Sequence, residues 1–396
     1  MRFSEIAGET GIFVDGDWIE KKDQDAKGAV RLIQLADVGP GEFRDKSDRH
    51  ITVEKADELH CTFLRKGDIL IARLGDPLCK ACVFPLDGLY ITAVDVAILR
   101  IGSDVVNPKY LIYLLNSPWF KDQVKQYESG TTRKRISRKN LDRIEMIFPP
   151  LPEQKRIVAR IEELFSQLDA GVETLKKTKA QLAVYRQAVL KEAFSDCIDS
   201  VTMESIAKMI DPQPSHRTPP EFENGIPYIG IGDIDYTGKT IRFKEARKVN
   251  PAVFEEHLQR YTLREGDFVM GKIGTIGKPF RLPLPQNYTL SANVILIQPD
   301  AEKINPEYLF WQFSSPLITE QLMEGKNETS QPAFGIQKAR LLQIKMCSPD
   351  AQDRIVYDIR EKISVCENIE QTVTLTLQQA EAMRQCILKD AFEGKM

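Results

Sequence analysis

This 396-residue chain lacks the features that would place it in a membrane or outside a cell. No apolar run approaches the roughly 18 residues of a membrane-spanning helix, and the start, MRFSEIAGET, lacks the basic and apolar segments of a secretory signal. The seven cysteines are odd in number and irregularly spaced, which favours reduced thiols over a disulfide framework. We therefore expect a cytoplasmic protein with no membrane contact.

Patterns of catalytic residues are also scarce. The four histidines are too few and too dispersed for a Ser-His-Asp triad or a His-rich metal site. Cys79 and Cys82 are spaced like half of a zinc site, with His60 and Cys61 upstream, but no cysteines occupy the matching positions in the second half, which favours structural thiols. The stretch GKIGTIGKPF at 271–280 lacks the residues of a nucleotide-phosphate loop. We predict no catalytic residue, metal or cofactor in this chain.

One pair of motifs resembles a catalytic sequence. The stretches NPKY at 107–110 and NPEY at 305–308 are similar to the Asn-Pro-Pro-Tyr motif of adenine-N6 methyltransferases, but the third residue differs in both. No strand followed by a Gly-rich loop is present to seat a methyl donor. Asn followed by Pro is also typical of a helix start, with Asn as the N-cap. We interpret both motifs as helix starts.

What the chain does contain is a long internal repeat. RQAVLKEAF at 186–194 returns, with conservative changes, as RQCILKDAF at 384–392, which is 198 residues later. Further matches keep their order, with offsets that drift by only a few residues, as loop insertions would produce. They are RLIQLADV at 31–38 with PYIGIGDI at 227–234, LRKGDILIARLGD at 64–76 with LREGDFVMGKIGT at 263–275, VNPKYLIYLLNSP at 106–118 with INPEYLFWQFSSP at 304–316, and QKRIVARI at 154–161 with QDRIVYDI at 352–359. The chain is therefore a tandem duplication with a period of about 198 residues.

Each half consists of a mixed part followed by a helical part. Residues 1–151 and 199–350 contain short β-rich runs, such as 68–73 and 293–297, punctuated by Gly, Pro and Asp. Residues 152–197 have no Pro after Pro152 and predict one long helix. Its apolar stripe repeats every seven residues at Ile161, Leu168, Leu175, Leu182 and Val189, with Leu164, Val172 and Tyr185 between them, and the second copy has Ile359, Cys366, Val373, Ala380 and Ile387.

These patterns predict an α+β fold with four segments. Two similar mixed α/β globular domains, residues 1–151 and 199–350, alternate with two long helices, residues 152–198 and 351–396. A helix of this length is far longer than the roughly 11–12 residues of an average globular helix. We expect the two helices to pair antiparallel as a coiled-coil spacer that holds the domains apart.

Local charge points to nucleic acid, although the net charge is only −3. The run TTRKRISRKNLDR at 131–143 holds six basic residues and one acidic residue, in the company of residue types that contact phosphates and base edges. The matching run in the second half keeps only Lys338 and Arg340. The alternative interpretation of the run at 131–143 is a solvent-exposed face that binds nothing. The alternative for 271–280 is a simple turn between strands. We predict DNA contacts at Arg133, Lys134, Arg135, Arg138 and Lys139 in the first domain, and at His216, Arg217, Lys272 and Lys278 in the second.

The start of the first long helix carries a family resemblance. FPPLPEQKRIVARIEELFSQLD at 148–169, followed by RQAVLKEAF, resembles the specificity subunit of type I restriction-modification systems, and the resemblance covers the entire chain. The second helix start, SPDAQDRIVYDI at 348–359, departs from the family pattern and keeps Gln352, Arg354, Ile355 and Val356.

The resemblance implies a non-catalytic subunit that binds double-stranded DNA. Each target-recognition domain would read one half of a bipartite target, and the helices would set the gap between the halves. Two modification subunits would dock on the chain and methylate adenine from S-adenosylmethionine, and restriction subunits, which are ATP- and Mg-dependent translocases and nucleases, would join them.

Two other functions stay open at this point. The chain could serve a related methyltransferase-nuclease system without a separate translocase, or it could be a two-headed interaction scaffold that binds no DNA. The basic residues at 131–139 favour the DNA-binding alternatives, because a scaffold has no need of them.

Overall fold

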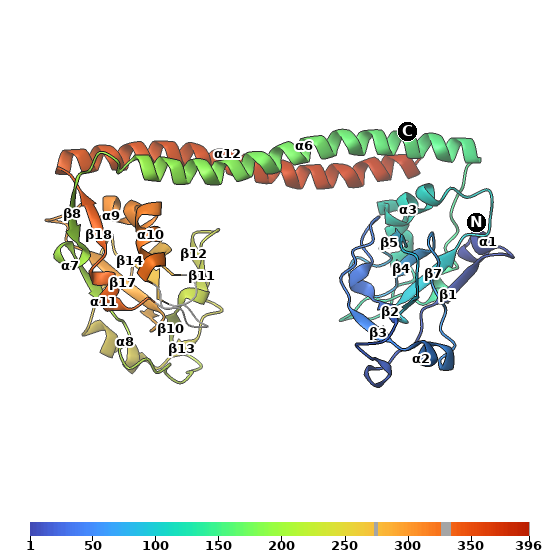
Figure 1. The fold of residues 1–396 in the computed structure, drawn as a ribbon, viewed down its shortest axis with the longest axis horizontal. Helices are drawn as coiled ribbons and strands as arrows, with labels where there is room; N and C mark the ends of the chain where they lie inside the picture. Colours follow the sequence, from blue (N-terminus) through green and yellow to red (C-terminus); the bar gives the residue numbers. More distant parts are fainter. Residues whose placement is uncertain (273–275, 326–333, 396) are drawn as a thin grey trace. The chain divides into compact units, whose positions relative to one another are not determined.

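The computed structural model describes residues 1–272, 276–325 and 334–395 (Figure 1). The chain divides into two compact units, Met1–Leu175 with Thr374–Met396, and Lys176–Val373. Each unit contains one mixed α/β globular part and a segment of both long helices, so the predicted fold class is confirmed. The predicted domain boundaries stay predictions. We call the residues before the first long helix, 1–150, the first head, and the residues between the long helices, 193–348, the second head.

The first head is built on a four-stranded antiparallel sheet in the order β1-β7-β4-β5, with a second sheet in the order β3-β2-β6. Within the second sheet, β2 runs parallel to β6 and antiparallel to β3. The strands are β1 Ile12–Asp15, β2 Val30–Ile33, β3 Arg49–Ile51, β4 Ile69–Ala72, β5 Ala81–Val83, β6 Tyr90–Thr92 and β7 Val96–Arg100. The helices are α1 Phe3–Ala7, η1 Lys21–Asp23, η2 Leu35–Asp37, α2 Val53–Glu58, α3 Pro108–Asn116, α4 Pro118–Lys125 and α5 Arg138–Leu141.

The second head repeats this plan. Its four-stranded antiparallel sheet has the order β9-β17-β14-β15, and β10 runs parallel to β16 and antiparallel to β13. Two further pairs are β8 with β18 and β11 with β12. The strands are β8 Asp199–Thr202, β9 Ala207–Ile210, β10 Ile226–Ile229, β11 Ile234–Asp235, β12 Thr240–Ile241, β13 Lys248–Val249, β14 Phe268–Gly271, β15 Pro279–Arg281, β16 Thr289–Leu290, β17 Val294–Pro299 and β18 Gln343–Met346. The helices are α7 Met203–Ile206, η3 Ile231–Asp233, α8 Pro251–Leu258, α9 Pro306–Phe313, α10 Pro316–Gly325 and α11 Ile336–Arg340.

The predicted strands and helix starts agree with these elements. The run at 68–73 forms β4, and the run at 293–297 forms most of β17. The side-chain oxygen of Asn107 accepts the backbone N–H groups of Lys109 and Tyr110, and Asn305 caps α9 in the same way. Each Asn-Pro motif is therefore the N-cap and first residue of a helix.

The central strands alternate between two apolar cores, as the pleat of a strand requires. In β4, Ile69 and Ile71 pack on the side of α3 and α4, whereas Leu70 faces the second sheet. The first of these cores also contains Ile161 of one long helix and Leu388 of the other. The sheet, its covering helices and the ends of both long helices therefore share one core in the first unit.

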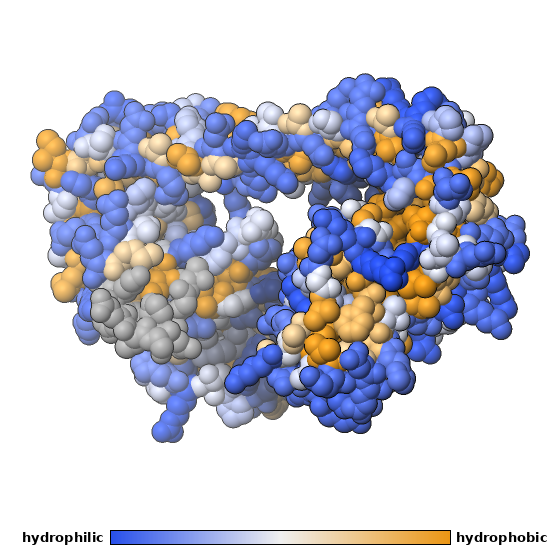
Figure 2. All heavy atoms as spheres, turned by 45° about the vertical axis from the view of Figure 1, so that its right-hand side comes forward, coloured by the Kyte–Doolittle hydropathy of each residue, from blue (hydrophilic) through white to orange (hydrophobic). Residues whose placement is uncertain are grey.

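The two long helices are α6 Leu151–Glu192, of 42 residues, and α12 Pro349–Phe392, of 44 residues. Helix α6 ends before the predicted residue 197, because the N–H and hydroxyl of Ser195 both donate to the Glu192 carbonyl and close a turn. Among the described residues, no helix combines the length and apolar character that crossing a membrane requires. The visible surface of the long helices, along the top of Figure 2, is mostly hydrophilic.

The predicted seven-residue stripe is buried along most of α12 and ranges from buried to partly buried along α6. In α12, Ile359, Cys366, Val373 and Ala380 are each less than a tenth exposed, so the small residues of the second copy are packed. The inclusion of Tyr185 in the stripe was wrong, because its side chain is 49% exposed. Ion pairs join Asp169 to Arg384 in the first unit and Arg186 to Glu370 at 2.9 Å in the second. From the first ion pair to the second, the residue number in α6 rises and the residue number in α12 falls, as antiparallel pairing requires.

A buried glutamine fixes each head to its long helix. The Asn107 N–H donates to Oε1 of Gln154 at 2.8 Å, and Nε2 of Gln154 donates to the carbonyls of Val105 and Pro149, each at 2.8 Å. Gln352 repeats the arrangement with the Asn305 N–H at 2.9 Å and the Cys347 carbonyl at 3.0 Å. Both side chains are almost fully buried. This explains why the divergent second helix start keeps its glutamine.

Candidate nucleic-acid interface

A cation at the end of the central strand forms the base of the candidate surface in each head. In the first head, Arg73 follows β4 and pairs with Asp15 at 2.9 Å. In the second head, Lys272 follows β14 and pairs with Asp211 at 2.9 Å. Arg73 and Lys272 occupy equivalent positions in the two copies of the sequence repeat. The two heads therefore hold one charge arrangement at the same corner of the sheet.

The same residues anchor a loop through their backbones. The Ile136 N–H donates to the Arg73 carbonyl at 3.0 Å, and the Phe334 N–H donates to the Lys272 carbonyl at 2.9 Å. On the other side, the N–H groups of Arg73 and Lys272 donate to the carbonyls of Asp95 and Asn293, each at 2.8 Å. A partly buried sheet corner thus holds Ile136 in the first head and Phe334 in the second.

In the first head this loop is the predicted basic run. Ser129 and Arg135 exchange both backbone hydrogen bonds, at 2.9 and 2.8 Å, and form a tight hairpin. Gly130 has φ +93°, and a Cβ there would lie 2.3 Å from the Arg133 carbonyl oxygen, so the turn requires glycine. The Gly75 N–H donates to the Lys134 carbonyl at 3.0 Å and ties the hairpin to the β4–β5 loop.

The structure brings the five predicted cations of the first head onto this hairpin and α5, but their charges differ in availability. Lys134 pairs with Glu128 at 3.0 Å, and Arg138 pairs with Asp15 at 3.3 Å. Arg133, Arg135 and Lys139 are exposed, and within the described part of the chain none of them forms an ion pair. Three free cations are therefore available to a phosphate backbone.

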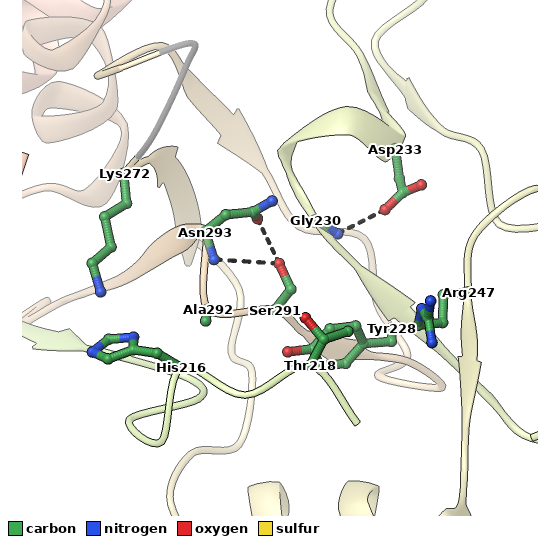
Figure 3. Close-up of a pocket in the computed structure, with 10 residues that line it drawn as sticks. All are labelled: His216, Thr218, Tyr228, Gly230, Asp233, Arg247, Lys272, Ser291, Ala292 and Asn293. Carbon is green, nitrogen blue, oxygen red and sulfur yellow. Dashed lines mark hydrogen bonds between the residues drawn. The ribbon is translucent and has the colours of Figure 1, made fainter. Parts of the chain in front are cut away.

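In the second head the candidate surface is a cleft of 480 Å³. Figure 3 shows Lys272 reaching toward His216 on one side of it and Arg247 on the other. Between them stand hydroxyl and amide groups that can bond to base edges or phosphates. The lining residues are His216, Thr218, Tyr228, Gly230, Asp233, Arg247, Lys272, Ser291, Ala292 and Asn293.

Two predicted residues of the second head lie outside this lining. Arg217 is exposed beside His216, and its backbone is held by Gln213 and Ser215. Lys278 lies in another groove, where its ammonium is 4.3 Å from the centroid of the Tyr236 ring. Residues 273–275 of the predicted Gly-rich turn, and 327–333 of the run that matches the basic one, lie outside the described residues. Lys338 and Arg340 are in α11.

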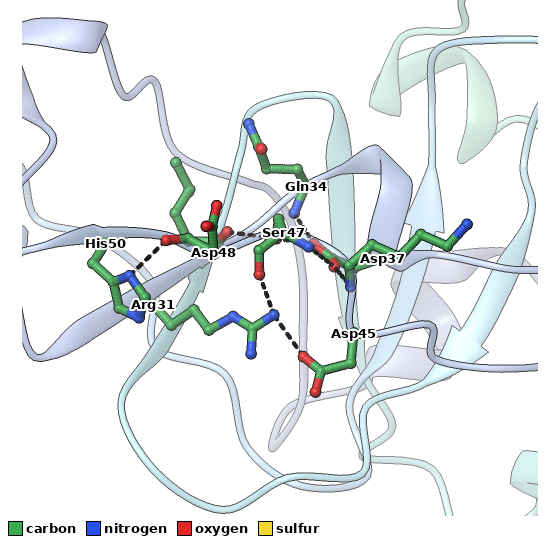
Figure 4. Close-up of polar contacts among 9 residues, drawn as sticks. Arg31, Gln34, Asp37, Asp45, Ser47, Asp48 and His50 are labelled. Atoms are coloured by element: carbon green, nitrogen blue, oxygen red, sulfur yellow. Dashed lines mark hydrogen bonds and ion pairs between the residues drawn. The ribbon is translucent and has the colours of Figure 1, made fainter. Parts of the chain in front are cut away.

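A rigid polar turn follows the first strand of the smaller sheet in each head. In the first head, Asp37 accepts the N–H groups of Gln34, Lys46 and Ser47 at 2.6 to 2.8 Å (Figure 4). Burial alone would raise the pKa of Asp37, but these hydrogen bonds and the Ser47 hydroxyl outweigh it and lower the pKa. In the second head, Asp233 accepts the Gly230 N–H at 2.8 Å at the edge of the cleft.

Several residues of these surfaces escaped the sequence reasoning. The ion pairs of Arg73 with Asp15 and of Lys272 with Asp211 carry no local motif, and Arg247 and Asn293 stand alone in the sequence. One signal was available, because the repeat aligns Arg73 with Lys272. That alignment could have added Arg73 to the predicted set.

The cysteines do not form a metal site in the described part of the chain. Cys79 and Cys82 are both buried, but Cys79 packs in the core beside α3, and Cys82 packs in the core on the other side of the sheet. Burial raises the pKa of both thiols, to about 11 for Cys79 and about 12 for Cys82. No cluster of three or more His, Cys, Asp or Glu suited to a metal ion occurs in residues 1–272, 276–325 and 334–395.

We expect Lys272→Met to destabilise the second head by about 2 kcal/mol, because it leaves the Asp211 carboxylate, whose side chain is 15% exposed, without its partner. Adding Asp211→Asn should recover part of this loss in a double-mutant cycle measured by chemical denaturation. The exposed pair Lys66–Asp87 is the matched control, with an expected coupling below about 0.5 kcal/mol. If the changes in unfolding free energy of the Lys272 and Asp211 substitutions were simply additive, the ion pair would not stabilise the second head.

The fold and the candidate surfaces define a class of protein: a tandem-duplicated α/β chain with two long helices and two heads that differ in their polar loops. The family model described as type I restriction modification DNA specificity domain matches residues 11–183. Residues 11–183 thus carry a type I DNA specificity domain, and the chain resembles the specificity subunits of type I restriction-modification systems.

One curated relative and two solved structures are similar to this chain. The specificity subunit of the type I restriction enzyme EcoBI from Escherichia coli is 22% identical over 325 residues, which are 75% of this chain and 68% of the relative. A structure described as showing complex assembly and conformational transition of the type I R-M system has a TM-score of 0.71 at 17% identity and covers 100% of this chain and 97% of the other. The HsdS subunit from Thermoanaerobacter tengcongensis has a TM-score of 0.51 at 17% identity, with coverages of 100% and 96%. Both structures share the fold.

Proposed function

We propose that this chain is the non-catalytic, sequence-reading subunit of a type I restriction-modification complex, and that each head reads one half of a bipartite DNA target. The proposal rests on one observation: the two heads share the same sheet framework, but their candidate contact surfaces differ. Both heads hold a cation–carboxylate pair at the same sheet corner. The first head extends this corner with a basic hairpin, and the second with a polar cleft. Two different surfaces on one frame suit the reading of two different half-sites.

The long helices supply the rest of the proposed function. Two heads on linked helices gain affinity from each other only when the spacing of their binding sites matches the spacing of the heads. The helices would therefore set the number of unread base pairs and dock two modification subunits. S-adenosylmethionine, ATP and Mg would be bound by the modification and restriction subunits, not by this chain.

Methylation mapping tests this proposal. The chain is co-expressed with its modification subunit in a host without adenine methylation, and N6-methyladenine is mapped in the DNA. We expect one split motif that disappears when this chain is omitted. A soluble complex that methylates no motif, together with DNA binding that does not depend on salt, would favour the interaction scaffold.

The role of the helices predicts a change in the gap. We expect that inserting seven residues into the middle of α6 and seven at the facing position of α12 changes the number of base pairs between the half-sites and leaves both half-sites unchanged. One heptad preserves the buried stripe and adds about 10 Å of helix, which is roughly three base-pair steps. The matched control is an insertion in α6 alone, which breaks the pairing. A methylated motif with its original gap would exclude the ruler role.

A further inference from the structure

Two thiols of the second unit meet at one buried phenol. The sulfur of Cys197 lies 3.3 Å from the Tyr308 hydroxyl oxygen, and the sulfur of Cys347 lies 3.6 Å from the same oxygen. The Tyr308 hydroxyl donates its own proton to the Lys345 carbonyl at 3.0 Å. Both thiols therefore act as donors to a single oxygen, which places the two sulfurs within two hydrogen-bond lengths of each other.

The backbone also brings the two cysteines to the same end of one strand pair. Strands β8 and β18 pair Asp199 with Met346. Cys347 directly follows that pair on one strand, and Cys197 precedes it by two residues on the other. In this register residue 198 would lie opposite Cys347, so the two cysteines are diagonal neighbours just past the end of the strand pair.

The two cysteines differ in access. Cys197 is 3% exposed, whereas Cys347 is partly exposed. A small molecule can therefore reach Cys347 first, and Cys197 can only react afterwards from within the protein. The repeat places Lys395 and Pro149 at the matching positions of the first unit, so this arrangement belongs to the second unit alone.

We propose that Cys197 and Cys347 form a dithiol site that exchanges with low-molecular-weight disulfides such as glutathione disulfide. In the first step the Cys347 thiolate attacks glutathione disulfide, forms a mixed disulfide and releases one glutathione. In the second step Cys197 loses its proton to solvent and attacks the Cys347 sulfur, which forms the Cys197–Cys347 bond and releases the second glutathione. The protein loses two electrons and two protons, and glutathione disulfide is reduced to two glutathiones.

The bond would tie the residues after α6 to the residues before α12. It would close the second head at its base, where Gln352 already holds the Cys347 carbonyl. Burial raises the pKa of the Cys347 thiol, so the first step should accelerate as the pH rises. This site is independent of DNA reading.

The chain contains its own controls. Cys386 is exposed on α12 and should take up glutathione as a lasting mixed disulfide. Cys79 and Cys82 have the spacing of a redox motif, but they are buried in separate cores and should remain thiols.

The test treats the full reduced chain with glutathione disulfide and maps each cysteine by peptide mass spectrometry. We expect a Cys197–Cys347 cross-link in the unaltered chain, and about tenfold more mixed disulfide at Cys347 in Cys197→Ser than in the unaltered chain. In Cys347→Ser, Cys197 should remain a thiol. Equal mixed disulfide at Cys347 with and without Cys197, or no reaction at Cys347 while Cys386 reacts, would overturn the proposal.

Discussion

Replacing Arg133, Arg135 and Lys139 with alanine is expected to weaken DNA binding by several hundred-fold at 0.1 M salt. Each phosphate contact releases counterions and changes affinity by about 8-fold at that concentration, so three contacts multiply to roughly 500-fold. These side chains are exposed and, in the described part of the chain, unpaired. The slope of log affinity against log salt should fall by about 3, and the loss should be similar for target and non-target duplexes.

A charge-matched variant separates this effect from a change in net charge. Lys66, Lys125 and Arg160 already pair with Asp87, Asp122 and Glu163. Replacing these three cations removes the same charge from other places, and we expect the affinity to change by less than about 3-fold. Fluorescence anisotropy over a salt series measures both variants. An unchanged slope in the first variant would remove the hairpin from the DNA interface.

Gln154→Ala is expected to destabilise the first unit by about 3 kcal/mol. The substitution removes three hydrogen bonds of 2.8 Å from a fully buried side chain and leaves one backbone N–H and two carbonyls without their partner. Gln352→Ala should cost about 2 kcal/mol in the second unit, because Gln352 makes two such bonds. Chemical denaturation with a probe in each unit measures both losses.

Gln187→Ala and Gln385→Ala are the matched controls, since these glutamines are exposed on the same two helices. Alanine is the best helix former, so the controls should stay within about 0.5 kcal/mol of the unaltered chain. If Gln154→Ala and Gln187→Ala were equally stable, the buried glutamine would not fix the head to its helix.

The sequence predicts the fold well because its strongest signals are periodic or repeated. The seven-residue stripe specifies α6 and α12, and the Asn-Pro pairs specify the starts of α3 and α9. Tyr185 was misplaced because the next residue, Arg186, faces α12 at this point of α6 and pairs with Glu370. The end of α6 was missed because Ser195 closes it through one local turn.

The candidate surfaces were predictable only in part, for a physical reason. A run of cations such as 133–139 is visible in the sequence, but the partner of each cation is not. Lys134 pairs with Glu128, 6 residues away, and Arg138 shares Asp15, 123 residues away, with Arg73. Lys272 was predicted as a DNA contact, and its charge is paired with Asp211 across 61 residues. Such pairings depend on tertiary structure, so charge availability could not be read from composition.

The division of the chain inside both long helices bears on how such genes could change. The unit boundaries fall after Leu175 in α6 and after Val373 in α12. A genetic crossover within the codons of α6 would therefore exchange one head together with its own stretch of helix. The incoming head must then pack against a resident stretch of α12, as Tyr110 packs against Phe392. The near-identity of RQAVLKEAF and RQCILKDAF keeps that packing surface interchangeable, so heads could be inherited as exchangeable parts.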